Sequence, residues 1–266
     1  MATTKTSIAT LQKMKQEGTK ISSLTAYDSS FAKLMTEQGV DFILVGDSLG
    51  NVVQGRDSTV PVTTDDMVYH TQCVRRGASD AFVIADMPFM TYSTPEQTYE
   101  VAARLMQAGA NMVKLEGGQW LVETIEGLKT RGIPVCAHLG LLPQSVNVLG
   151  GYKVQGKEQQ QADDTLNQAL ALEKAGAQLL VLECVPASLG KRITEQLSIP
   201  TIGIGAGAEC DGQVLVVHDM LGLNKEFKPR FLRRYADLDS NITEAVQQYI
   251  SDIKSGEFPN EDEEYS

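Results

Sequence analysis

Polar side chains that could do chemistry stand at the ends of several apolar runs in this sequence. Asp47 and Ser48 follow one run, Asp86 follows the next, and Glu183 ends a later one. A single aspartate in such a position more often forms a turn by bonding its own backbone. Asp47 and Asp86 together, however, could place carboxylate oxygens around one hard cation. Oxygen ligands without a set of histidines or cysteines favour Mg²⁺ over Zn²⁺, so we predict a Mg²⁺ site here.

Lys114 and Glu116 stand two residues apart in another apolar run, MVKLE. Alternate side chains of a strand point to the same face, so these two would share one face while Val113 and Leu115 pack under the covering helices. An unpaired buried charge is costly, and Lys114 therefore needs a carboxylate partner or an anionic ligand. The alternative is a structural ion pair without a catalytic role.

Two further features carry less weight. His138 ends an apolar run, where a lone histidine is more often a core residue than a ligand. The glycines of GIGAG (203–207) could surround a phosphate, but close packing of the backbone explains them equally well.

Eight short apolar runs would position these side chains. They are nearly continuous in apolar residues, as parallel strands covered on both faces should be, and amphipathic segments alternate with them. This order predicts a (β/α)₈ TIM barrel, one domain over residues 1–266, with a doubly wound open sheet as the alternative. The predicted strands are Ile21–Thr25, Phe42–Gly46, Phe82–Ala85, Met112–Leu115, Pro134–His138, Leu179–Leu182, Thr201–Ile204 and Val214–Val217.

An internal repeat predicts equivalent positions for two glutamates. AGANMVKLE (108–116) and AGAQLLVLE (175–183) match at five of nine positions, and each predicts a helix end, a turn and a strand that ends in glutamate. Glu116 and Glu183 should therefore occupy equivalent places where the strands of a barrel end, which is where catalytic residues lie in this fold.

Composition narrows the class of protein. Hydrophobic residues make up 42% of 266, enough for a large core, and the net charge of −11 argues against a nucleic-acid partner. No apolar run reaches the roughly 20 residues that span a bilayer. Four scattered cysteines and the absence of a secretory or Arg-rich leader pattern predict a cytoplasmic protein. We expect residues 256–266 to form a frayed acidic tail and 150–164 a long loop.

Several longer motifs resemble the ketopantoate hydroxymethyltransferase family. The resemblance runs from about residue 5 to residue 255 with the motifs in unbroken order. The motifs are LTAYDSSFAKL, LVGDSLGNVVQGRDSTVPVT, ADMPFM, GANMVKLEGG, AHLGLLPQSVNVLGGYKVQG, LLVLECVP and GIGAGAECDGQVLVVHD.

This resemblance implies a (β/α)₈ barrel that transfers a hydroxymethyl group from 5,10-methylenetetrahydrofolate to 3-methyl-2-oxobutanoate. The product is 2-dehydropantoate (ketopantoate), formed in the first step of pantothenate biosynthesis through a Mg²⁺-stabilised enolate. The family also implies a homo-oligomer, commonly a decamer. The implied roles are metal binding by Asp47, Asp86 and Glu116, substrate binding by Asp47, Ser48, Asp86, Lys114 and His138, and proton removal by Glu183.

Two other functions remain open at this stage. A related Mg²⁺ barrel could cleave or rearrange C–C bonds of a small 2-oxo acid as a lyase or mutase. A barrel that only binds a small acid, or serves as a structural subunit, would have no reason to keep a buried lysine. The residues that contact the folate are not identified by the sequence.

Overall fold

The computed structural model describes residues 5–151 and 153–265, apart from the side chain of Leu149. It divides into two compact units, Met1–Val216 and Val217–Ser266. The single domain expected over 1–266 and the frayed tail expected over 256–266 stay predictions, and Ser266 lies outside the described residues.

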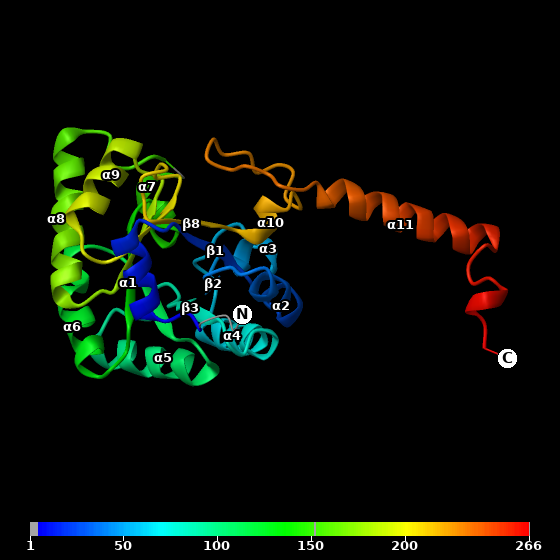
Figure 1. Cartoon of the computed structure of the whole chain (residues 1–266), viewed down its shortest axis with the longest axis horizontal. Coiled ribbons are helices and arrows are strands. Elements are labelled where there is room, and N and C mark those ends of the chain that lie inside the picture. Colours follow the sequence, from blue (N-terminus) through cyan, green and yellow to red (C-terminus); the bar gives the residue numbers. More distant parts are fainter. Residues whose placement is uncertain (1–4, 152, 266) are drawn as a thin grey trace. The chain divides into compact units, whose positions relative to one another are not determined.

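The first unit contains a closed barrel of eight parallel strands in chain order (Figure 1). This confirms the predicted TIM barrel, and the open-sheet alternative is wrong. Every observed strand lies within two residues of its predicted bounds. The strands are β1 Ile21–Thr25, β2 Phe42–Val45, β3 Phe82–Asp86, β4 Met112–Glu116, β5 Val135–Gly140, β6 Leu179–Glu183, β7 Thr201–Ile204 and β8 Gly212–Leu215.

Helices alternate with the strands, and local sequence signals set their ends. Thr63 caps α4 through a reciprocal capping box with Asp66, and Thr94 caps α5, whose first residue is a proline. In the first unit the α-helices are α1 Ile8–Glu17, α2 Ser29–Glu37, α3 Leu49–Val52, α4 Thr64–Gly77, α5 Pro95–Ala108, α6 Val122–Thr130, α7 Val146–Leu149, α8 Gln159–Ala175 and α9 Ala187–Gln196. Two short 3₁₀ helices, η1 Gln119–Leu121 and η2 Pro143–Ser145, lie in loops that follow β4 and β5.

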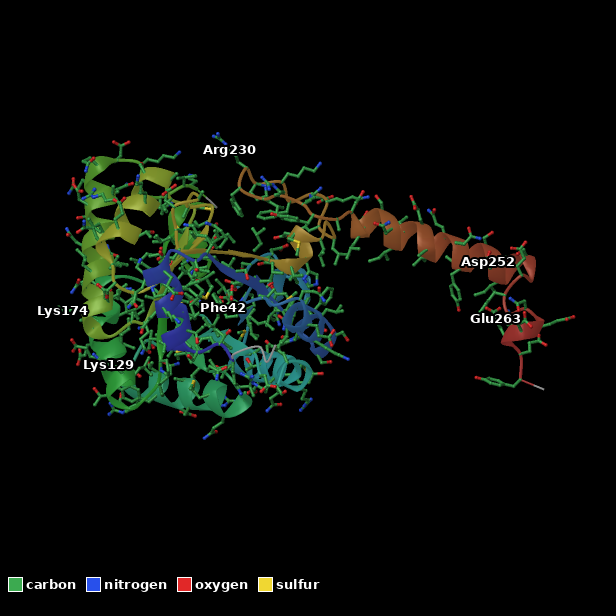
Figure 2. All side chains as sticks on the ribbon, in the orientation of Figure 1. Phe42, Lys129, Lys174, Arg230, Asp252 and Glu263 are labelled. Carbon is green, nitrogen blue, oxygen red and sulfur yellow. The ribbon has the colours of Figure 1, made fainter. Side chains whose placement is uncertain are left out.

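The barrel interior is apolar toward the start of the strands and polar where they end. Phe42 lies among the packed side chains inside the barrel (Figure 2). On β4, Met112 belongs to the same buried core, and Lys114 and Glu116 follow it at two-residue intervals on the same face. The alternation that packs the core therefore also aims these two charged side chains into the barrel, as predicted.

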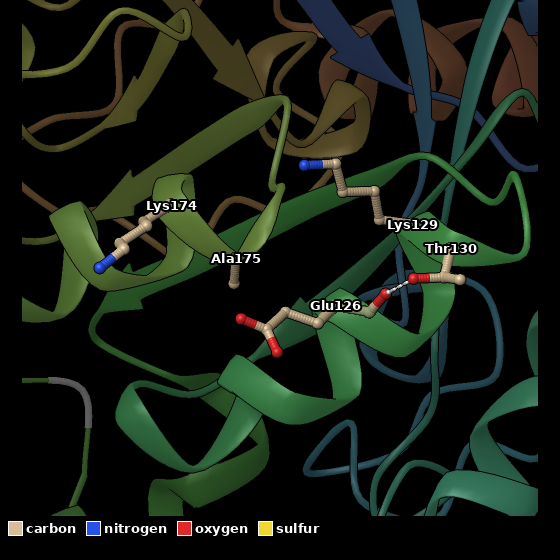
Figure 3. A pocket seen from close by; sticks show the side chains of 5 residues that line it. All are labelled: Glu126, Lys129, Thr130, Lys174 and Ala175. Carbon is tan, nitrogen blue, oxygen red and sulfur yellow. Dashed lines mark hydrogen bonds between the residues drawn. The ribbon is translucent and has the colours of Figure 1, made fainter.

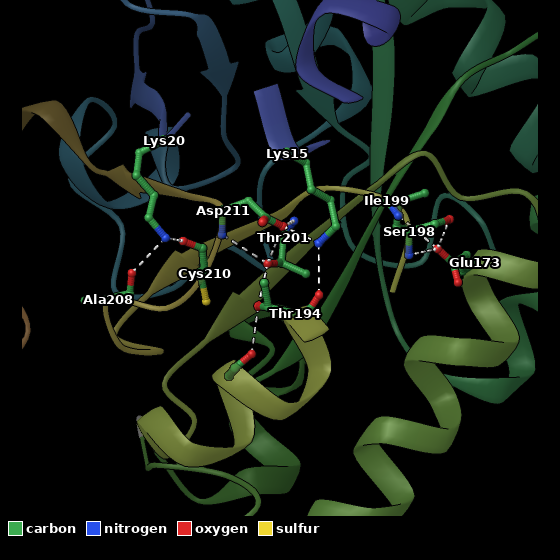
Figure 4. A network of polar contacts seen from close by, with 11 residues as sticks. Lys15, Lys20, Glu173, Thr194, Ser198, Ile199, Thr201, Ala208, Cys210 and Asp211 are labelled. Carbon is green, nitrogen blue, oxygen red and sulfur yellow. Dashed lines mark hydrogen bonds and ion pairs between the residues drawn. The ribbon is translucent and has the colours of Figure 1, made fainter. Parts of the chain in front are cut away.

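Helix α1 closes the opposite end of the barrel, where the strands begin. Leu11 of this helix is part of the barrel core. Lys15 donates to the carbonyl oxygen of Thr194 at 2.9 Å and forms an ion pair of 2.7 Å with Asp211 (Figure 4). Asp211 in turn accepts from the backbone of Thr201, the first residue of β7. These contacts fix α1 across the barrel end that lies away from the polar strand tips.

The second unit contains α10 Val217–Met220, α11 Leu238–Ser255 and the 3₁₀ helix η3 Glu261–Glu263. Arg234 donates to the carbonyl oxygens of Asn224, Lys225 and Phe227 and so holds the segment before α11. Within residues 5–151 and 153–265, none of the helices combines the length and the apolar character needed to cross a bilayer.

Candidate active site

Three acidic side chains and one lysine meet at the ends of β2, β3 and β4. The Lys114 ammonium lies 2.7 Å from Asp86 Oδ1 and 3.9 Å from Glu116 Oε1. The backbone N–H of Asp47 donates to Asp86 Oδ2 at 3.0 Å. All four residues are buried, none more than 4% exposed. The structure thus brings the predicted residues of neighbouring strands together, while their roles stay predictions.

The side chain of Asp47 reaches across the barrel end. Its Oδ2 accepts a hydrogen bond of 2.8 Å from Nε2 of Gln144, in the loop after β5. Backbone bonds close the turn after β2, from Leu49 to Gly46 and from Gly50 to Asp47. Because the backbone closes that turn, the carboxylate of Asp47 is available for contacts within the site.

Ser48 lies at the edge of the same cluster. Its hydroxyl is 2.8 Å from the hydroxyl of Tyr27, which follows β1. A Cβ added at Gly46 would lie 2.8 Å from Ser48 Oγ and 3.5 Å from Asp86 Oδ2. A larger residue at position 46 would therefore fill the space between these two oxygens, and glycine leaves it open.

His138 lies between two carboxylates. Its Nδ1 is 3.4 Å from Glu116 Oε1, and its Nε2 is 3.4 Å from Glu183 Oε2. Burial and the Lys114 charge lower the pKa of His138, but Glu116 and Glu183 outweigh them and raise it to about 9. The two carboxylates thus favour the imidazolium form of His138, which lies within the acidic cluster and is not an isolated core histidine.

Glu183 is the most open acid of the group. Its side chain is 16% exposed, against 2% for that of Glu116. Its carbonyl oxygen accepts from Leu141 at 2.8 Å, and a Cβ at Gly140 would approach that oxygen to 2.2 Å. Gly140 also has φ +93°, a conformation that favours glycine. Gly140 thus allows the close approach of β5 and β6 that places Glu183 beside His138.

Negative charge is in excess among these buried groups. Burial raises the pKa of Asp47 well above its usual value, and the carboxylates of Asp86 and Glu116 raise it further. Burial lowers the pKa of Lys114, but Asp86, Glu116 and Asp47 outweigh this effect and raise it, so Lys114 stays an ammonium. Burial raises the pKa of Glu116, yet His138 and Lys114 hold it below its usual value. A cation near Asp47 would relieve this repulsion.

The donor set suits a cation that needs few protein ligands. Among residues 5–151 and 153–265, no three His, Cys, Asp or Glu side chains are arranged to enclose a metal ion. Mg²⁺ usually keeps several waters and takes only one or two carboxylates, which Asp47 and Asp86 could supply. Glu116 Oε2 accepts from the Gln144 backbone, whereas Oε1 has only ion-pair contacts with Lys114 and His138 and no hydrogen-bond partner within the described residues.

Sequence reasoning missed three residues that contact this cluster. Gln144 and Tyr92 are buried, and Tyr92 donates to Gln144 Oε1. Tyr27 contacts Ser48. Gln144 and Tyr92 lie outside the strands, and their only signal was membership of the longer motifs or proximity to them. The GIGAG glycines pack closely: a Cβ at Gly207 would lie 2.6 Å from that of Ala187, which favours the packing interpretation.

A surface groove of about 440 Å³ lies elsewhere, along α6 and α8 (Figure 3). None of the predicted site residues lines it. Its lining residues are Glu126, Lys129, Thr130, Lys174 and Ala175.

Solved structures share the fold at low sequence identity. Phosphonopyruvate hydrolase matches with a TM-score of 0.65 and 11% identity, covering 97% of this chain and 90% of that one. A phosphoenolpyruvate phosphomutase from Streptomyces platensis subsp. rosaceus matches with a TM-score of 0.63 and 16% identity, covering 94% and 88%. At these identities the likeness concerns the barrel alone.

Sequence relatives are far closer. The chain is 83% identical to the 3-methyl-2-oxobutanoate hydroxymethyltransferase of Idiomarina loihiensis over 265 residues, which is 100% of both chains. It is 60% identical to the protein of that name from Alteromonas mediterranea, over 96% of this chain and 97% of the relative. A family model described as ketopantoate hydroxymethyltransferase matches residues 5–261. Because that match and both relatives extend along nearly the whole sequence, the chain belongs to the ketopantoate hydroxymethyltransferase family.

Proposed function

We propose that this enzyme transfers a hydroxymethyl group from 5,10-methylenetetrahydrofolate to 3-methyl-2-oxobutanoate and forms 2-dehydropantoate in a Mg²⁺-dependent reaction. The observation that carries the proposal is the buried group of Asp47, Asp86 and Lys114 at the barrel end, with Glu183 across from it beyond His138. Membership of the family supports the same reaction.

Asp47 and Asp86 would hold the Mg²⁺, with Glu116 as the third carboxylate of the metal site, beside Lys114. When bound, Mg²⁺ supplies Lewis-acid polarisation of the carbonyl oxygen of the 2-oxo acid. Lys114, which stays charged, and Ser48 would bind the carboxylate and carbonyl groups of the substrate and hold its C3–H bond in place.

Glu183 would remove the proton from C3, since it is the most open carboxylate of the group. His138 contacts Glu183 and would orient it. The electron pair left at C3 then forms a bond to the one-carbon unit of the folate. The two bonds between that unit and the folate nitrogens break, and one water supplies the hydroxyl group. The nitrogens take up the other proton of that water and the proton removed by Glu183, and tetrahydrofolate leaves.

The proposal is tested by following 2-dehydropantoate formation with and without Mg²⁺, and with and without 5,10-methylenetetrahydrofolate. We expect product only when both are present. Product formation that is indifferent to EDTA, or to omission of the folate, would refute the proposal.

The second candidate is a Mg²⁺-dependent lyase or mutase of small 2-oxo acids. Only the fold supports it, through a 2,3-dimethylmalate lyase with a TM-score of 0.60 and 16% identity over 98% of this chain. The same assay separates the two functions, because a lyase or mutase would convert its substrate without folate.

We further propose that the enzyme is cytoplasmic and assembles as a homo-oligomer. The family resemblance supports a decamer, which for a 28.9 kDa chain would have a mass near 290 kDa. Light scattering coupled to gel filtration measures this mass directly, and a monomer at working concentration would refute the assembly.

A further inference from the structure

Gln144 links two acids that come from different strands. Its side-chain N–H₂ donates to Asp47 Oδ2 at 2.8 Å and to the carbonyl oxygen of Met87 at 2.9 Å. Its backbone N–H donates to Glu116 Oε2 at 3.1 Å. The residue is only 4% exposed, although it lies in the 3₁₀ helix η2 after β5. One residue thus fixes the position of one carboxylate from the end of β2 and one from the end of β4.

The contacts of Gln144 determine which end of its amide faces Asp47. The Met87 carbonyl oxygen can only accept, so the N–H₂ group must face it and Asp47 Oδ2, and Oε1 must point away. On that other side, Tyr92 donates to Oε1 at 2.5 Å. Burial raises the pKa of the Tyr92 phenol, which therefore stays a donor. The ring of Tyr92 is itself fixed by stacking on Trp120 at 5.8 Å.

We propose that Gln144 is a positioning residue for this reaction, with Tyr92 setting the orientation of its amide. The inference rests on the proposed function. Gln144 bonds Asp47 through its side chain and Glu116 through its backbone, and so fixes the directions of both carboxyl groups without adding a charge to the site. Gln144 acts only through these carboxylates and through no atom of the substrate.

Both the length of the Gln144 side chain and its amide group are required for these contacts. Asparagine would be one methylene shorter and could not reach Asp47 and Tyr92 together while its backbone stays bonded to Glu116. Glutamate would place a third acceptor against Asp47 and Met87. Partners that orient metal ligands typically change metal affinity 10- to 100-fold when they are removed.

The test measures Mn²⁺ binding, as a probe for the divalent site, together with the KM for 3-methyl-2-oxobutanoate. We expect Gln144→Met to raise the Kd for Mn²⁺ roughly 10- to 100-fold and to raise the KM for the oxo acid. The reason is that no hydrogen bond from residue 144 would then fix the direction of the Asp47 carboxylate. Tyr92→Phe, which removes only one hydroxyl, should shift both in the same direction by a smaller factor, about threefold or more. Restoring an amide in Gln144→Asn should not restore binding.

The matched control is Thr194→Val, which removes a buried hydroxyl bonded to Gly190 and Thr201 at the other end of the barrel. It should lower stability and leave the Mn²⁺ Kd unchanged. If the parent forms product but Gln144→Met and Tyr92→Phe both keep its Mn²⁺ Kd, the inference is wrong. If Gln144→Met does not fold, an unchanged Kd in Tyr92→Phe alone overturns it. A parent that forms no product refutes the proposed function instead.

Discussion

Glu183→Gln is the substitution that tests the proposed base most directly. Glutamine has nearly the same shape, and its amide oxygen can still accept from His138, whose Nε2 lies 3.4 Å from Glu183 Oε2. The change therefore removes the proton acceptor while keeping the packing. Glu116 cannot easily replace it, because it lies on the other side of His138 with one oxygen bonded to the Gln144 backbone. We expect C3 proton removal to slow by about 10²- to 10⁴-fold, which corresponds to about 3–5 kcal/mol in activation free energy.

The assay follows hydrogen exchange at C3 of 3-methyl-2-oxobutanoate in D₂O by proton NMR, with Mg²⁺ and without folate. Leaving out the folate isolates proton removal from the later steps. Calorimetry should show that Glu183→Gln still binds the oxo acid within about threefold of the parent. The control is Glu126→Gln, which removes the same charge from the exposed surface of α6. Exchange within threefold of the parent, with binding intact, would show that Glu183 is not the base.

Three further predictions concern stability and reactivity. Lys114→Met removes the buried ammonium that pairs with Asp86 and Glu116. It should lower the free energy of unfolding, measured in urea, by about 3–5 kcal/mol. A loss below about 1 kcal/mol would contradict this pairing. Lys15→Met removes the contacts to Thr194 and Asp211 and should lower the free energy of unfolding by about 1–3 kcal/mol. Hydrogen exchange at C3 should stay at the parent rate, because the residues at the ends of the strands are unchanged. Burial and the Glu183 charge raise the pKa of Cys184 to about 12. At pH 8 the thiolate fraction of Cys184 is then about 10⁻⁴. Alkylation of Cys184 by iodoacetamide should therefore be about 10³-fold slower than that of an ordinary thiol. Mass spectrometry at pH 8, 9 and 10 should show a tenfold rise per unit for Cys184, and rapid labelling at pH 8 would refute the shift.

The barrel could be predicted because its strands are short, apolar and separated by clear helix signals. The largest differences lie at the end of β5 and at β8. Gly140 continues β5 because it pairs with Glu183, although a glycine does not by itself indicate a strand. Strand β8 begins at Gly212, which pairs with Ile21 of β1. Pairing with a strand that is distant in the sequence fixes these strand ends, and such pairing cannot be predicted from the local sequence.

The site could be predicted only where one strand contains the information. Alternation along β4 places Lys114 and Glu116 on the inner face, and this follows from the sequence alone. His138 was expected to be a core histidine more often than a site residue, because its position between Glu116 and Glu183 depends on the register of three strands. Gln144 lies in a loop, where a glutamine ordinarily suggests solvent exposure.

The internal repeat places two glutamates at equivalent strand ends but in different surroundings. Glu116 and Glu183 end equivalent strands, as AGANMVKLE and AGAQLLVLE predict, yet their surroundings differ. Lys114 shares the strand and face of Glu116, and Gln144 bonds its second oxygen, so this acid is held in place. Val181 takes the position of Lys114 on β6, and Glu183 is left more open, with His138 as its neighbour. One lysine in place of a valine, two residues before the glutamate, therefore distinguishes the acid that is held in the buried cluster from the more open acid that we propose as the base.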